Sequence, residues 1–214
     1  MAAPSPSVPD AGYTAFVHLA LLLSLVSGLT VQLGQADLSP TVPTALGGYT
    51  ARNGKLCKLP GEPLSARAAI FQSGRTRIAL VSADLLTIPE SLYEEVEKGL
   101  PEDLFLVLVA THTHCAPDSQ ALNRRMDFAL PGIARFNADR LASTAHEIRS
   151  AVQKALTRPE IPLPKLAIRI GHRNLNRARR EMAYPDTMAV RLLQRSGAPL
   201  LTHYAAHAVL YGPA

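Results

Sequence analysis

Two histidines separated by a single residue stand in residues 110–117, which read ATHTHCAP. They follow the apolar run LFLVLVA, Leu104–Ala110, which is typical of a strand covered on both faces. Side chains alternate along a strand, so His112 and His114 are expected on one face, about 7 Å apart, at the carboxyl end of that strand. The pair could bind one metal ion, or it could be two half-exposed histidines that make loop hydrogen bonds.

A second pair of histidines, His203 and His207, lies four residues apart near the end of the chain. No glutamate stands between them, so the HExxH motif of zinc metalloproteases is absent. On a strand that runs into a turn, this spacing again places both on one face, and the later position favours His207 as the exposed residue. We therefore expect His203 to be structural. His18 and His146 lie in no pattern of residues that suggests a site.

Asp84 ends the strand-like run IALVSAD. At a strand terminus its carboxylate could orient an imidazole by accepting that ring's second N–H, as a group that supports a metal ligand. It could equally cap a turn ahead of the helix that is expected to begin at Pro89. The sequence has no GxSxG motif and no glycine-rich phosphate loop, which disfavours serine hydrolases and nucleotide-binding enzymes.

The elements that must position these residues belong to a folded domain. Among the 214 residues, 47% are hydrophobic and 18% are charged, which excludes intrinsic disorder. Apolar residues at helical spacing predict helices over residues 89–100 and 137–156, and Ser73-Gly74 predicts a hairpin between two strands. Further strands are expected in residues 29–40, 165–172, 187–194 and 198–212. This order predicts an α/β fold, a layered domain around a mixed β-sheet.

Charge and cysteine content exclude other classes of protein. The net charge of +5 is mild, and the arginines around Arg177 lack aromatic neighbours for base stacking, so we expect no nucleic-acid partner. Two cysteines, Cys57 and Cys115, cannot build a disulfide framework, and no finger-type zinc spacing is present.

An apolar stretch near the amino terminus, residues 15–29, contains no charge and is shorter than the roughly 20 residues of a bilayer span. Val26 and Gly28 suit cleavage after Gly28, although no Lys or Arg precedes the stretch. Residues 1–28 are interpreted as a cleaved export signal. An uncleaved membrane anchor, a buried helix and a misassigned start are the alternatives.

Several motifs in one order resemble a known family. The segments LGQADLSP, GGYTAR, LSARAAIF, RIALVSADLL, VLVATHTHCAP, NLNRARREMAYPDTMAVRLL and HYAAHAVLYG run as in the N-terminal catalytic domain of neutral/alkaline non-lysosomal ceramidases. The resemblance covers the chain from about Leu29 to its end. The expected domain organisation is therefore a leader, residues 1–28, and a ceramidase-like domain, residues 29–214, that is incomplete at its C-terminus.

The resemblance implies a zinc-dependent amidase that cleaves the N-acyl bond of ceramide or a related N-acyl or ester substrate. It implies that His112 and His207 bind Zn²⁺ and that His114 is catalytic beside the metal. Asn176 and Arg177 match a motif that contacts substrate, and Arg177 or the metal would stabilise an oxyanion. The implied partners are a lipid or other N-acyl small molecule and a membrane surface, and the implied location is secreted or periplasmic.

Two departures from the family pattern leave alternatives open. The family continues HTHSGP where this chain has Cys115-Ala116-Pro117, so the thiol could be a spectator, an extra ligand or an oxidation target. The family also takes a Glu and a Tyr zinc ligand from beyond the region that ends here at Ala214. The alternative function is a truncated or non-catalytic relative that binds metal weakly.

Overall fold

The first three strands follow one another as antiparallel neighbours in the computed structural model, which describes residues 28–59, 61, 63–163, 167–172, 188–193 and 199–204. They are β1 (Thr30–Asp37), β2 (Ser65–Ser73) and β3 (Thr76–Ala83). The predicted hairpin is confirmed, since Ser73 pairs with Thr76 and Gly74 has a φ of 56°. Glycine adopts this left-handed conformation without a Cβ clash, which permits the tight connection.

Both predicted helices are confirmed as α2 (Glu90–Glu97) and α3 (Ala138–Leu156). Asn137 caps α3, because its side chain accepts a hydrogen bond from the backbone N–H of Arg140 at 2.8 Å. In α2, Leu92 and Val96 are one turn apart and fully buried, as the apolar spacing predicted.

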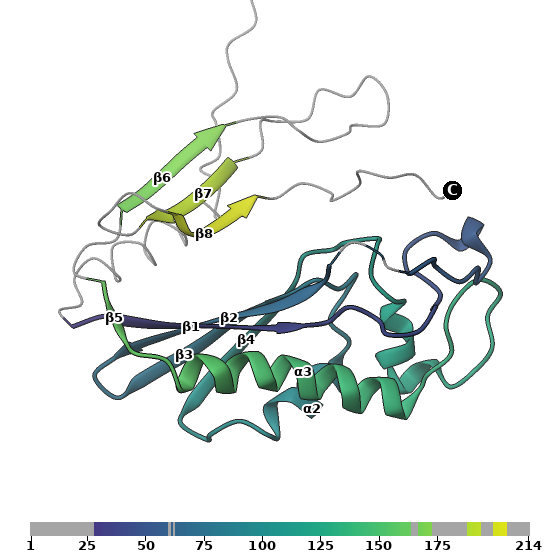
Figure 1. Ribbon diagram of the computed structural model, residues 1–214, viewed down its shortest axis with the longest axis horizontal. Coiled ribbons are helices and arrows are strands. Elements are labelled where there is room, and N and C mark those ends of the chain that lie inside the picture. Colours follow the sequence, from purple (N-terminus) through teal and green to yellow (C-terminus); the bar gives the residue numbers. More distant parts are fainter. Residues whose placement is uncertain are drawn as a thin grey trace, which may run out of the picture.

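A parallel crossover completes the main sheet. The chain passes from β3 through α2 to β4 (Leu104–Ala110), which pairs in parallel with β3. The short strand β5 (Ile161–Pro162) pairs with β1 at the opposite edge, so the order is β4-β3-β2-β1-β5. This mixed sheet with its two helices confirms the predicted α/β layered architecture (Figure 1).

The principal hydrophobic core lies between the sheet and the two helices. Alternate residues of β2, β3 and β4 pack against the apolar stripes of α2 and α3, and the fully buried ones include Ile70, Val81 and Ile148. The expectation that β4 is covered on both faces was wrong for the described residues, because Phe105 is 66% exposed and Val109 is 42% exposed. Both helices lie on the same side of the sheet, and β4 is an edge strand, so its opposite face has less cover.

Close approach of α3 to β1 depends on a glycine. A Cβ on Gly34 would lie 2.2 Å from the backbone oxygen of Ala151, so any larger residue would push helix and strand apart. Two residues earlier, the buried side chain of Gln32 donates hydrogen bonds to the carbonyl oxygens of Leu156 (3.3 Å) and Arg158 (2.6 Å). This amide satisfies carbonyl groups that the end of the helix would otherwise leave without partners.

The last three strands form a second sheet. β6 (Ala167–His172), β7 (Met188–Leu193) and β8 (Pro199–Tyr204) pair in antiparallel fashion in the order β6-β7-β8. The strands predicted in residues 165–172 and 187–194 are therefore confirmed. The one predicted in residues 198–212 is confirmed as far as Tyr204, and residues 205–212 lie outside the described residues. Leu200 of β8 packs against the small apolar cluster of Leu29, Val31 and Leu163, so this sheet approaches the main sheet from the side opposite α3 (Figure 1).

Candidate active site

The histidine segment follows the carboxyl end of β4. Ala83 and Ala110 are partners in the parallel register, so β3 and β4 end together at one edge of the sheet. Beyond that edge, the backbone N–H of Thr111 donates to the Ala83 carbonyl at 3.0 Å, and that of Thr113 donates to Leu85 at 3.2 Å. The histidines therefore lie where parallel strands commonly place ligand-binding residues.

His112 departs from the predicted strand geometry. Its φ is 59°, in the left-handed region, which costs a residue with a Cβ roughly 1–2 kcal/mol. The strand ends at Ala110, so the expected same-face placement of His112 and His114 along a strand was wrong. Instead the chain turns around the end of β3, and the two rings meet edge to face with their centroids 5.4 Å apart and their planes at 84°.

The exposed ring of His112 is oriented by a backbone carbonyl. Its Nδ1 lies 2.8 Å from the carbonyl oxygen of Leu86. A carbonyl oxygen can only accept, so Nδ1 is the donor in this contact, and the neutral form of the ring then has its lone pair on Nε2. Histidines that bind metals commonly have this support from a backbone carbonyl, so His112 fits the role of a zinc ligand through Nε2.

His114 is buried, with 8% of its surface exposed, and packs against the loop before β2. The ring of Tyr49 lies against it at a centroid distance of 4.5 Å and a tilt of 36°. The guanidinium of Arg52 lies 4.9 Å from the Tyr49 ring centroid and donates to the backbone oxygen of His114 at 2.8 Å. The same nitrogen also donates to the Gly47 oxygen at 3.2 Å, so Arg52 connects the two loops.

Glycine is required beside this ring. Gly48 has a φ of 89°, and a Cβ built on it would lie 2.0 Å from Nδ1 of His114. The loop is held in place by backbone hydrogen bonds from Gly47 to Ala116 (3.1 Å) and from Asp118 to Ala45 (3.0 Å). The conformation of Gly48 and the position of His114 are therefore mutually dependent.

Asp84 connects β2 with the residue that precedes His112. Its carboxylate accepts hydrogen bonds from the backbone N–H (2.9 Å) and hydroxyl (3.1 Å) of Ser65 and from the hydroxyl of Thr111 (3.1 Å). It also forms an ion pair with Arg67 at 3.3 Å. These contacts hold the start of the histidine segment, and the predicted support of an imidazole by Asp84 stays a prediction.

The residues that sequence reasoning missed are Gly48, Tyr49, Arg52 and Asp118. The first three belong to the GGYTAR segment, whose paired glycines are the signal for a backbone conformation that other residues disfavour. Asp118 is 6% exposed, and its side chain accepts from the backbone N–H groups of Gln120 (3.0 Å) and Ala134 (2.9 Å). The sequence signal for it was an aspartate at the start of a turn, which is a common capping position.

The remaining predicted ligand and substrate-contacting residues are not described by the structure. Asn176, Arg177 and His207 lie outside the described residues. His203 is on β8, where it is exposed. Among the described residues, no group of three or more His, Cys, Asp or Glu side chains could hold a metal ion. Because His207 lies outside them, His112 is the predicted ligand whose surroundings the structure describes. Cys57 and Cys115 are both free thiols.

A cavity of about 630 Å³ lies on another side of the loop that follows the histidines. Its walls are residues 37–42, Pro117 with Asp118, and the first half of α3. Neither His112 nor His114 lines it. We place the candidate chemistry at the histidines, because the cavity walls hold no comparable pair of oriented imidazoles.

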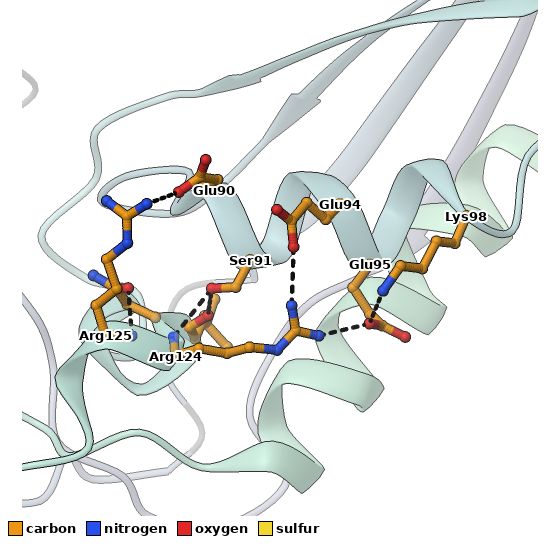
Figure 2. Close-up of polar contacts among 9 residues, drawn as sticks. Glu90, Ser91, Glu94, Glu95, Lys98, Arg124 and Arg125 are labelled. Carbon is orange, nitrogen blue, oxygen red and sulfur yellow. Dashed lines mark hydrogen bonds and ion pairs between the residues drawn. The ribbon is translucent and has the colours of Figure 1, made fainter.

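An ion-pair cluster fastens the segment after the histidines to α2 (Figure 2). Arg124 contacts Glu94 at 3.0 Å and Glu95 at 2.9 Å, and Arg125 contacts Glu90 at 2.5 Å. Beneath these exposed pairs, the buried hydroxyl of Ser91 donates to the Leu122 oxygen at 2.6 Å and accepts from the Arg124 backbone N–H at 3.2 Å. The cluster thus anchors the 3₁₀ turns Ser119–Leu122 and Arg124–Met126.

Comparison with known proteins yields a match of fold. No protein-family model and no curated protein sequence matches the chain. The crystal structure of neutral ceramidase from Pseudomonas aeruginosa superposes with a TM-score of 0.65 at 17% identity, covering 87% of this chain and 33% of that one. The chain has a ceramidase-like fold. A ceramidase complexed with C2 superposes with a TM-score of 0.63 at 18% identity, covering 82% of this chain and 30% of the other.

The ceramidase-like fold agrees with the resemblance seen in the sequence motifs. The chain spans about a third of the length of the ceramidase structures that it matches. Within its described residues, neither helix combines the length and the apolar character that crossing a bilayer requires.

Proposed function

We propose that this chain contributes to the catalytic site of a zinc-dependent hydrolase of the ceramidase type. Its reaction would be hydrolysis of the N-acyl amide of ceramide, or of a related N-acyl or ester lipid. The observation that carries the proposal is His112, with its Nδ1 held by the Leu86 carbonyl, at the end of parallel strands in a ceramidase-like fold.

His112 and His207 are the proposed zinc ligands. Bound zinc would act as a Lewis acid that polarises the amide carbonyl and acidifies a water molecule for attack. The donor set is compatible with zinc, which prefers imidazole nitrogen and, at catalytic sites, has three protein ligands and an open position.

His114 would supply the proton that the departing amine needs. Its ring lies edge to face with that of His112 at 5.4 Å between centroids, which places it next to the proposed metal ligand. Its burial shields the ring from bulk water. Arg177 is proposed to stabilise the developing oxyanion, and Asn176 to contact the substrate.

The test is release of fatty acid from an N-acylsphingosine in mixed micelles, measured for the longest natural form of the protein with zinc and after chelation. Loss of turnover on chelation, with recovery on adding zinc, would support the proposal. His112→Ala should abolish turnover, whereas His146→Ala, an exposed change on α3, should not. Stable zinc binding without turnover would support the alternative of a non-catalytic relative.

A further inference from the structure

The aromatic ring of Tyr49 contacts both a cation and an imidazole. Its partners are the Arg52 guanidinium, 4.9 Å from the ring centroid, and the His114 ring, 4.5 Å between centroids. We infer that Tyr49 and Arg52 are positioning residues, which fix the orientation of the His114 imidazole beside His112. The catalytic consequence of this inference rests on the proposed function, whereas the structural part does not.

Arg52 fixes the backbone of His114. One of its terminal nitrogens donates both to the His114 oxygen, at 2.8 Å, and to the Gly47 oxygen, at 3.2 Å. The two carbonyls come from loops far apart in sequence, so the guanidinium holds the loops at one separation. The guanidinium carbon also lies over the ring of Tyr49, 4.9 Å from its centroid, and a lysine ammonium could not make this contact together with the same hydrogen bonds.

Tyr49 fixes the side chain of His114. Packing against an aromatic ring restricts rotation of the imidazole about its Cβ–Cγ bond. The backbone of Gly48 also limits the movement of the His114 ring, because even a Cβ at position 48 would lie 2.0 Å from its Nδ1. The ring is thereby confined by residues 48 and 49 in the arrangement that sets its plane at 84° to that of His112.

This confinement matters for proton transfer. A general acid must reach the leaving atom at hydrogen-bond distance, and a displacement of about 1 Å can lower a rate roughly a hundredfold. The contact between Tyr49 and His114 is one between rings, with their centroids 4.5 Å apart and their planes tilted by 36°. Phenylalanine at position 49 should therefore preserve the orientation of the His114 imidazole, and leucine should not.

The structural test uses nuclear magnetic resonance of the whole chain with ¹³C-labelled histidine. The tyrosine ring current should displace the His114 ring proton resonances from their usual positions. Tyr49→Phe should retain this displacement, and Tyr49→Leu should remove it. Phe105→Leu, which truncates a 66% exposed ring on β4, is the matched control and should leave His114 unchanged. Unchanged His114 resonances in Tyr49→Leu would overturn the inference.

The functional test measures kcat and KM of the same variants on the micellar lipid substrate. We expect kcat to fall about tenfold or more in Tyr49→Leu and Arg52→Lys with KM nearly unchanged, and Tyr49→Phe to restore wild-type turnover. A Tyr49→Phe variant as impaired as Tyr49→Leu, with its His114 resonances still displaced, would overturn the inference. If the unaltered protein has no turnover, the proposed function fails, and the resonance measurements alone decide the positioning role.

Discussion

The carbonyl oxygen of Leu86 lies 2.8 Å from Nδ1 of His112 and so determines which imidazole nitrogen can bind a metal. Leu86 follows β3 by three residues, whereas His112 follows β4 by two, so the parallel register of these strands brings the two residues together. Because Nδ1 is held by this carbonyl, Nε2 is the nitrogen that we propose as the metal-binding atom.

Metal content should depend on His112. We expect zinc stoichiometry, measured by inductively coupled plasma mass spectrometry on the longest natural form, to fall in His112→Ala and in His207→Ala, because each would remove a ligand. His203→Ala should retain zinc, since His203 is the downstream histidine that is predicted to be structural. Full zinc content in both ligand variants would contradict the assignment.

Gly48→Ala should destabilise the protein more than Gly54→Ala does. Both glycines have a positive φ, 89° and 72°, so each variant has a backbone penalty of roughly 1 kcal/mol. A Cβ at position 48 would also clash with His114 at 2.0 Å, whereas nothing lies within 4 Å of one at position 54. Urea denaturation should resolve the difference. Equal losses of unfolding free energy would show that the loop relaxes away from the ring.

Ser91→Ala should lower the free energy of unfolding by about 1–3 kcal/mol, because the buried carbonyl of Leu122 would lose its donor. The exposed Ser143→Ala on α3 is the control, and its effect should stay within about 0.5 kcal/mol. Thermal and urea denaturation both report the quantity. An unchanged free energy of unfolding in Ser91→Ala would contradict this prediction and indicate that water replaces the hydroxyl.

Arg124→Ala should cost less than about 1 kcal/mol through its ion pairs, although it contacts two carboxylates. Arg124, Glu94 and Glu95 have 42%, 49% and 30% of their side-chain surfaces exposed, so water screens the pairs. The difference from the unaltered protein should shrink as salt rises from low concentration to about 1 M. A large cost that salt does not reduce would point to packing of the arginine stem as its main contribution.

Export should leave a mature chain that begins at Leu29. This residue is 5% exposed, packs with Val31 and Leu163, and accepts the backbone N–H of Leu163 at 2.8 Å, whereas Gly28 is exposed. Cleavage after Gly28 would therefore spare the packed residues. N-terminal sequencing of protein from the native host provides the measurement, and a cytosolic chain that retains Met1 would refute the export signal.

The sequence alone determined the elements whose signals are local. Apolar spacing located α3, and Ser73-Gly74 located the hairpin, because helical periodicity and tight turns depend on residues close together in the chain. The motif order also predicted the ceramidase-like fold that the comparison of structures shows. The order of strands was not accessible in this way.

Only the tertiary structure decided the geometry around the histidines. Alternation along a strand predicted a common face for His112 and His114. Instead, the chain turns where Thr111 and Thr113 donate backbone hydrogen bonds to Ala83 and Leu85, and His112 has a φ of 59°. The contact between Arg52 and His114 spans 62 positions in sequence. Such contacts arise when the packing of the sheet closes distant loops on one another, so no local pattern of residues can specify them.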